Sequence, residues 1–157
     1  MRLLIPAALS AALLATPAFA QDAPDRAAIA DSYIAAYEAM DFETMQALLA
    51  EDAVFVDLTS LEHEQYAPGW NWTGAEAIIA GVRGFGAERI DYVATQRFHG
   101  SGVTVISGHA DVAYPGGQLF RYPIVTTVTV NAEGRVSEHR DYTDYDGAAR
   151  VDQDLEN

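Results

Sequence analysis

Two segments of the sequence each place a histidine and an aspartate two residues apart. Because side chains alternate across a β-strand, His109 and Asp111 share one face, and so do His139 and Asp141. An earlier predicted strand carries one more acid, Asp57. If these faces converge, three carboxylates and two imidazoles meet on the floor of one pocket.

Such a set has the residue types of general acid–base catalysis. Neighbouring carboxylates raise one another's pKa values, so one of them can hold a proton while another stays ionised. A histidine titrates near neutral pH and can orient or relay that proton. The same spacing also fits a solvated sheet face on which each histidine merely satisfies an aspartate, and the spacing leaves both readings open.

Other chemistries have little support in the sequence. Two His-x-Asp pairs without a third histidine are a weak metal signal, so we expect no metal and no cofactor. The chain contains no cysteine, which excludes thiol chemistry and thiolate metal sites. It also has neither a Gly-x-Ser-x-Gly elbow nor a phosphate-binding loop, so serine hydrolases and nucleotidases are disfavoured.

The elements that must position these residues begin with three helices. Apolar residues at helical spacing predict a first helix from Asp25 to about Met40, and Asp41 can cap a shorter second one. A third helix is predicted from Ala75 to about Phe85.

The rest of the domain is predicted to be a sheet. Residues typical of strands, bounded by turn residues, fall in segments 53–58, 90–99, 102–114, 119–130 and 135–142. Turns such as Pro115-Gly116-Gly117 join the later strands as hairpins. Helices followed by hairpin-linked strands predict an α+β domain, and a strongly bent sheet closed by helices would enclose a cavity.

The charge of the chain limits its partners. Nine Lys and Arg residues face 23 Asp and Glu residues, which gives a net charge of −14. Such a field repels phosphate backbones, so nucleic acid is a poor candidate partner. We interpret the acidity as an aid to solubility. The more specific alternative is that it serves to bind a cationic ligand.

The first twenty residues have the three parts of a secretory signal peptide. Arg2 supplies the positive charge, Leu3 to Leu14 form a short apolar core, and small residues precede a cleavage point after Ala20. The alternative, a membrane anchor, needs roughly 20 apolar residues, and this run is shorter. We therefore expect a periplasmic or secreted protein whose mature part, residues 21–157, is one domain without a membrane span.

The layout of the mature chain resembles the nuclear transport factor 2-like superfamily, and within it the SnoaL-like and limonene-epoxide-hydrolase-like members. The resemblance covers residues 27–151. It rests on the segments LLAEDAVF (48–55), WTGAEAI (72–78) and GRVSEHRDY (134–142). It implies a cone-shaped α+β fold, in which a strongly bent, mostly antiparallel sheet and three helices of the N-terminal half enclose a pocket. It also implies a homodimer formed through the open sheet face.

The resemblance also suggests roles for single residues. In the epoxide hydrolases of this fold an Asp–Arg–Asp set activates water, with a Tyr and an Asn holding it. Asp141 matches the catalytic base and Asp111 the second aspartate, whereas His109 stands in place of the arginine. Phe55 and Asp57 stand in place of the Tyr and the Asn. The SnoaL-like cyclases, with an Asp acid–base in a hydrophobic pocket, resemble this pattern better.

Two functions remain open at this point. The first is an Asp/His acid–base enzyme, of the isomerase, cyclase or hydrolase type, that acts on a small apolar molecule. Its expected catalytic residues are Asp141, Asp111 and His109. The second is a non-catalytic module that binds a small molecule in the same pocket. In both cases the expected pocket residues are Phe55, Asp57, His139, Trp70 and Trp72.

Overall fold

The computed structural model describes residues 24–151, and the predicted signal peptide lies outside them. The helices are α1 (Arg26–Glu38), α2 (Phe42–Leu48), the 3-10 turn η1 (Glu64–Tyr66) and α3 (Ala75–Gly84). The strands are β1 (Leu49–Asp57), β2 (Asn71–Thr73), β3 (Arg89–Gly100), β4 (Val103–Tyr114), β5 (Gln118–Val130), β6 (Val136–Thr143) and β7 (Ala149–Arg150). No helix among the described residues is long and apolar enough to span a membrane.

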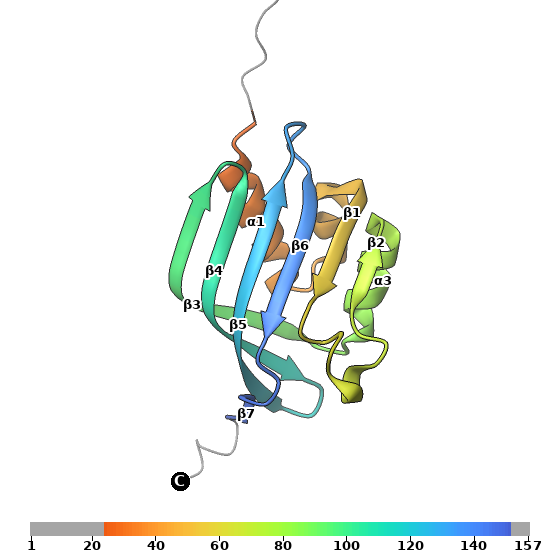
Figure 1. Ribbon diagram of the computed structural model, residues 1–157, viewed down its shortest axis with the longest axis vertical. Coiled ribbons are helices and arrows are strands. Elements are labelled where there is room, and N and C mark those ends of the chain that lie inside the picture. Colours follow the sequence, from red (N-terminus) through yellow and green to blue (C-terminus); the bar gives the residue numbers. More distant parts are fainter. Residues whose placement is uncertain (1–23, 152–157) are drawn as a thin grey trace, which may run out of the picture.

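The strands form one strongly curved sheet with the order β2-β1-β6-β5-β4-β3, and β7 pairs with β5 (Figure 1). All neighbours are antiparallel except β1 and β6, which run parallel. The helices pack against the concave face, so the sheet and helices form a cone. This confirms the predicted α+β fold.

The starts of the first two helices follow from the sequence. The carboxylate of Asp25 accepts a hydrogen bond from the backbone N–H of Ala28 at 3.1 Å. The predicted cap Asp41 does the same for Thr44, also at 3.1 Å. Such caps satisfy backbone donors that the first helical turn leaves unpaired. Two short strands, β2 and β7, were not expected, because each consists of only two or three residues.

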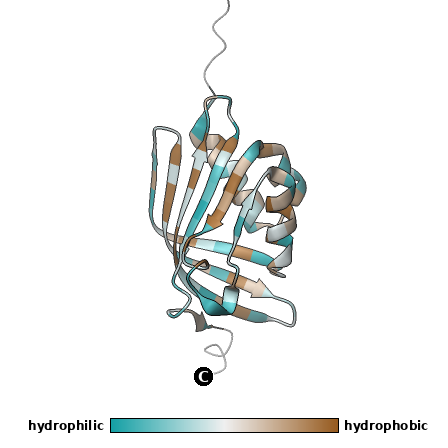
Figure 2. Cartoon of the chain, turned by 45° about the vertical axis from the view of Figure 1, so that its right-hand side comes forward, coloured by the Kyte–Doolittle hydropathy of each residue, from teal (hydrophilic) through white to brown (hydrophobic). Residues whose placement is uncertain are grey.

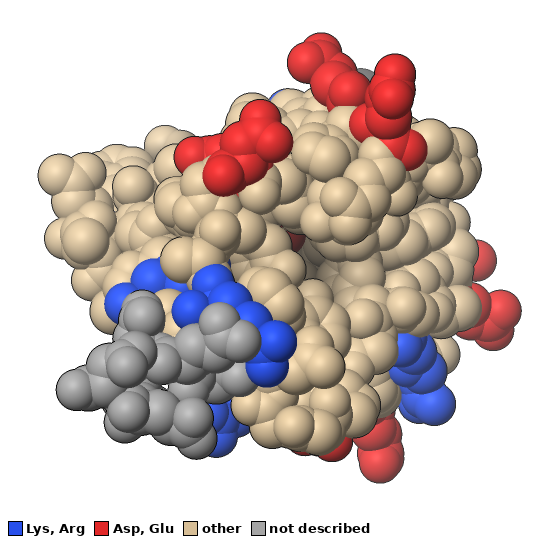
Figure 3. All heavy atoms as spheres, turned by 90° about the horizontal axis from the view of Figure 1, so that it is seen from below, with Lys and Arg blue, Asp and Glu red and all other residues tan. Residues whose placement is uncertain are grey.

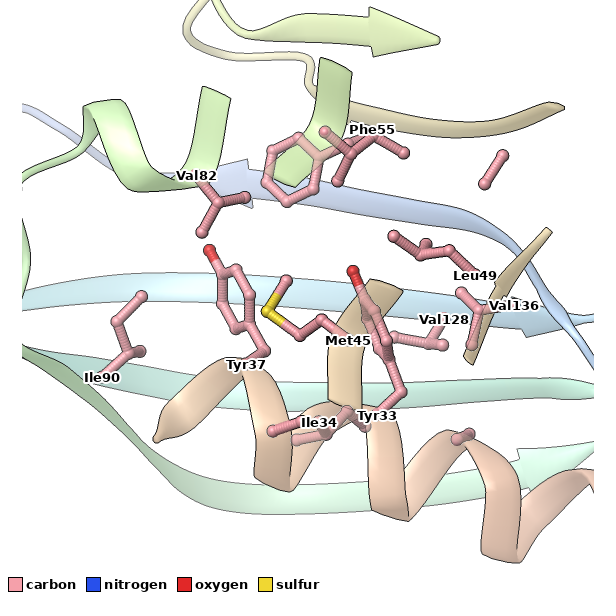
Figure 4. Packing of buried hydrophobic residues seen from close by; sticks show 14 of the residues in the cluster. Tyr33, Ile34, Tyr37, Met45, Leu49, Phe55, Val82, Ile90, Val128 and Val136 are labelled. Atoms are coloured by element: carbon pink, nitrogen blue, oxygen red, sulfur yellow. The ribbon is translucent and has the colours of Figure 1, made fainter. Parts of the chain in front are cut away.

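The hydrophobic core lies between α1, α3 and the concave face of the sheet. Figure 4 shows Tyr33 and Tyr37 projecting from α1 into this core, with Phe55 and Val82 on its far side. All four side chains are buried. Apolar and polar residues alternate along several strands, so that one face can pack on the core while the other meets water (Figure 2).

Candidate functional site

The concave face of the sheet encloses a cavity of about 220 Å³. It opens at the end of the molecule seen in Figure 3, where the surface is hollowed. Of the 17 described residues that line it, eight are aromatic, six are aliphatic or Gly, and three are polar. The polar three are Asp57, Asp141 and Thr143. An apolar wall with a few polar groups is typical of a small-molecule site.

Asp141 on β6 is held by a chain of buried hydrogen bonds. Its Oδ1 atom accepts the hydroxyl of Thr126 at 2.5 Å and lies 3.1 Å from Nε2 of His139. On the other side of the imidazole, Nδ1 lies 3.1 Å from the hydroxyl of Tyr33. Asp141, His139 and Thr126 are each at most 3% exposed, and Tyr33 is fully buried. Packing and hydrogen bonds together therefore fix the orientation of this carboxylate.

The donors in this chain can be assigned from the partners. The Tyr33 hydroxyl has no other acceptor within residues 24–151, so it donates to Nδ1 of His139. Nε2–H of His139 is then the donor of the hydrogen bond to Oδ1 of Asp141. Burial, with a smaller contribution from the Asp141 charge, raises the pKa of Tyr33, which keeps this phenol protonated at neutral pH. The imidazole thus positions Asp141 through this hydrogen bond.

The second oxygen of Asp141 is different. Within the described part of the chain Oδ2 has no hydrogen-bond partner, and Asp141 lines the cavity. A carboxylate with one oxygen fixed and the other directed at a ligand space can accept a proton or a hydrogen bond from whatever enters. This is the arrangement that a general base requires.

Asp57 on β1 also faces the cavity, but both of its oxygens are occupied. Oδ1 accepts hydrogen bonds from the backbone N–H groups of Thr59 and Ser60 and from the Thr59 hydroxyl, at 2.7–3.2 Å. Oδ2 accepts the hydroxyls of Thr143 at 2.8 Å and Tyr145 at 2.5 Å. Asp57 therefore joins the turn after β1 to the segment after β6, and it has a structural role.

Three tyrosines surround the two carboxylates. Burial, followed by the charges of neighbouring groups, raises the pKa of Tyr37 and of Tyr92. Burial and the hydrogen bond to Asp57 raise that of Tyr145. All three phenols are therefore neutral hydrogen-bond donors at physiological pH. The Tyr37 hydroxyl has no protein partner within residues 24–151, although the residue lines the cavity.

The expected convergence of polar faces is wrong for β4. The cavity is lined by Ala110, Val112 and Tyr114, so His109 and Asp111 lie on the opposite, outer face of the sheet. There Asp111 forms a bidentate pair with Arg121, at 2.7 Å for both contacts, which lowers the pKa of Asp111. Alternation defines two faces of a strand but not which one turns inward, and here the apolar face does.

The structure gathers some predicted pocket residues and not others. Asp57, Asp141 and Trp70 line the cavity. Phe55 and His139 pack behind its floor, with ring centroids 4.5 Å apart. Trp72 lies outside the lining and covers Gly81 of α3, where an added Cβ would come within 2.3 Å of the indole.

The abundance of aromatic residues, Tyr92 and Tyr114 among them, fits an apolar pocket wall, but the sequence did not lead us to assign the tyrosines of the wall as pocket residues. They are Tyr37, Tyr66, Tyr92, Tyr114, Tyr122 and Tyr145. The available signals were the helical spacing of Tyr33 and Tyr37 and the alternation that places Tyr114 on the inner face of β4.

Solved structures with this fold include two from Shewanella that are assigned as SnoaL-like polyketide cyclases. The protein from S. putrefaciens CN-32 is 22% identical over 87% of this chain and 94% of its own, with a TM-score of 0.66. The protein from S. denitrificans OS-217 is 24% identical over 85% and 98%, with the same TM-score. A Mycobacterium tuberculosis protein in complex with estradiol-17beta-hemisuccinate is 19% identical over 79% and 97%, with a TM-score of 0.63. At these identities the likeness concerns the fold.

Among curated proteins none matches this sequence significantly. The sequence profile of one family does match, over residues 30–139, and that family is the SnoaL-like domain. The match spans most of the described chain, from the first buried residues of α1 to His139 on β6, and it agrees with the cone-shaped architecture of the structural neighbours. This protein therefore belongs to the SnoaL-like domain family, with the nuclear transport factor 2-like fold.

Proposed function

We propose that this protein is a cofactor-independent acid–base enzyme in which Asp141 moves a proton on a small, largely apolar molecule. The observation that carries the proposal is the asymmetry of the Asp141 carboxylate. Oδ1 is fixed by His139 and Thr126, whereas Oδ2 has no partner among residues 24–151 and lies in a cavity with mostly aromatic and aliphatic walls. Because apolar walls exclude water, they strengthen the electrostatic interaction between the Asp141 carboxylate and its substrate.

The proton transfer is written for a carbonyl compound. Oδ2 of Asp141 takes a proton from the carbon beside the carbonyl, and the electrons of the C–H bond form an enolate. The neutral Tyr37 hydroxyl is the donor available to the enolate oxygen. In a β,γ-unsaturated carbonyl compound the product is a dienolate, and return of the proton from Asp141 to its γ-carbon completes an isomerisation. Attack of the enolate carbon on a second carbonyl, with protonation of the new alkoxide, completes a cyclisation.

The family context supports this reaction class. Two structural neighbours are assigned as SnoaL-like polyketide cyclases, and another holds a steroid derivative. An Asp–Arg–Asp set of the epoxide-hydrolase type is not assembled among residues 24–151, since His109 and Asp111 face away from the cavity. Proton transfer by a single aspartate is therefore favoured over hydration of an epoxide.

The test is proton exchange on a simple carbon acid. 2-Tetralone, a two-ring ketone, is incubated in D₂O with the mature protein, and the loss of its α-proton signals is followed by NMR. We expect exchange faster than the buffer rate, in proportion to protein concentration. Exchange at the buffer rate by a protein that binds the ketone would contradict the proposal.

The second candidate function is a non-catalytic binding module. It is favoured by the complete hydrogen bonding of Asp57, because this carboxylate is then not free to act as a second acid–base group. Asp141 is left as the only cavity-lining carboxylate with an unpartnered oxygen in the described chain. A module of this kind would bind the ketone and leave its α-protons unexchanged. The same NMR samples report both binding and exchange.

We also propose that two copies associate through the outer face of the sheet. This face exposes the large apolar side chains Val93, Phe98, Val125 and Tyr142, and Phe98 is 63% exposed. Light scattering should give the mass of a dimer for the wild type and that of a monomer for Phe98→Ser. Leu61→Ser, an exposed apolar residue outside the strands, is the matched control and should stay dimeric. A monomeric wild type would overturn the dimer.

We further propose that the domain acts in the periplasm or outside the cell. The support is the order of charge, apolar core and small residues in positions 1–20. Expression of the full chain in a secreting bacterial host should yield a protein whose intact mass and first residue correspond to a start at Gln21. Recovery of the uncleaved chain in the cytoplasmic fraction would contradict export.

A further inference from the structure

The described lining of the cavity contains two carboxylates and no basic side chain. Asp57 and Asp141 are paired neighbours on the parallel strands β1 and β6, and both face the same space. Among residues 24–151, no Lys, Arg or His lines the cavity. His139 contacts Asp141 from behind, with Nε2 3.1 Å from Oδ1, and is not among the described residues that line the cavity. Two desolvated carboxylates side by side are costly unless a positive group joins them.

A cluster of aromatic rings lies beside these carboxylates. Tyr66, Trp70, Tyr122 and Tyr145 pack against one another and line one part of the cavity, and we call this wall the aromatic box. Their ring centroids are 4.4 Å apart for Tyr66 and Tyr145, 5.8 Å for Trp70 and Tyr145, and 6.1 Å for Tyr122 and Tyr145. The Tyr145 hydroxyl donates to Asp57, so the box adjoins a fixed negative charge. Tryptophan and tyrosine faces attract cations, most strongly where water is excluded.

The hydrogen bonds already made limit the kind of cation. A primary ammonium group has three N–H donors that need acceptors. Asp57 already accepts five hydrogen bonds, and Oδ2 of Asp141 is the one unpartnered carboxylate oxygen of the described cavity lining. A nitrogen with one N–H donor, or with none, needs no more acceptors than this one oxygen provides. Its alkyl groups would face the aromatic box.

From these observations we infer that the ligand of the cavity carries a tertiary or quaternary ammonium group, held by the aromatic box and by the charges of Asp57 and Asp141. The inference rests on the proposed function in one respect, namely that this cavity is the ligand site. It narrows the ligand from a small, largely apolar molecule to a lipophilic amine. The net charge of −14 also favours the approach of a cation.

The test compares two probes of the same shape and different charge. 3-(Trimethylammonio)phenol and 3-tert-butylphenol differ by the replacement of a quaternary nitrogen with carbon. Isothermal titration of the mature protein with each probe, at neutral pH, measures the two dissociation constants. We expect the cation to bind about tenfold tighter, as an aromatic and anionic site provides. Equal binding, or tighter binding of the tert-butyl probe, would overturn the inference.

Variants test whether the cation binds in the cavity or at the acidic surface of the protein. Asp141→Asn and Asp52→Asn each remove one negative charge, the first from the cavity and the second from an exposed position on β1. Asp141→Asn should weaken binding of the cation several-fold and leave the neutral probe unchanged, whereas Asp52→Asn should change neither. Trp70→Leu should reduce the preference for the cation by a similar factor. Equal effects of the two Asp→Asn variants would place the cation on the surface.

The outcomes for the two proposals are distinguishable. Calorimetry registers binding without turnover, so selective binding of the cation together with no α-proton exchange on 2-tetralone removes only the enzymatic function. Exchange on 2-tetralone together with preference for the neutral probe removes only the cationic ligand.

Discussion

Asp141→Asn should reduce α-proton exchange by a factor of about 10²–10⁴, the usual contribution of a positioned acid–base group. The fold should tolerate the change. The amide oxygen can still accept the Thr126 hydroxyl and the His139 N–H, and the amide nitrogen takes the place of Oδ2, which has no partner in the described chain. The substitution therefore removes the base and leaves its supporting hydrogen bonds in place.

Two measurements make this result interpretable. The rate of exchange is measured by NMR, and the thermal midpoint of each variant is measured by circular dichroism. Asp52→Asn is the control, since it removes an equal charge from an exposed position and should keep the wild-type rate. If Asp141→Asn keeps the wild-type rate while folding normally, Asp141 is not the base. If instead it unfolds, its buried network is structural and the catalytic role loses its main support.

Asp57→Ala should destabilise the fold by about 3–5 kcal/mol, the typical cost of removing one member of a buried charged network. The carboxylate is 1% exposed and accepts hydrogen bonds from two backbone N–H groups and three hydroxyls. Truncation leaves these donors without their acceptor, and each buried unsatisfied donor costs roughly 1–3 kcal/mol. The turn after β1 and the segment that carries Tyr145 would lose their common anchor.

Urea denaturation followed by circular dichroism measures this effect as a shift of the unfolding midpoint. Thr143→Val is an intermediate case, since it removes one of the five donors and keeps the shape of the side chain. It should cost about 1 kcal/mol. A midpoint for Asp57→Ala within error of the wild type would show that water replaces the carboxylate, and Asp57 would then lose its structural role.

Asp57 and Asp141 show why residue type and strand position do not fix a role. They are partners in the β1–β6 register, both are buried, and both face the cavity. Asp57 is followed by Thr59 and Ser60, whose donors close a turn around it. Within the described residues, Asp141 has two side-chain donors, and both reach Oδ1. Local chain geometry thus makes the first an anchor and leaves the second available to a ligand.

Much of the fold could be predicted from the sequence. The start of the first helix near Asp25, the cap Asp41, the spacing of apolar residues in α1 and α3, and the turn residues between the later strands each depend on neighbours a few positions away. The pairing of His139 with Asp141 on one strand face was also predicted, since alternation is a property of any extended chain. These features follow from local geometry, which a sequence carries directly.

The site required tertiary structure. The parallel pairing of β1 with β6 joins Asp57 to Asp141 across more than half of the chain, and no local pattern announces it. The polar residues of β4 form a face as predicted, but the sheet turns that face outward because Ile106, Ala110 and Val112 gain more by burial in the core. The wall of the cavity combines tyrosines from α1, η1, β3, β4, β5 and the segment after β6. The sequence alone therefore determined which residues alternate and where elements begin. Long-range packing decided which faces meet, because the free energy of burial depends on the whole enclosed surface and not on any one segment.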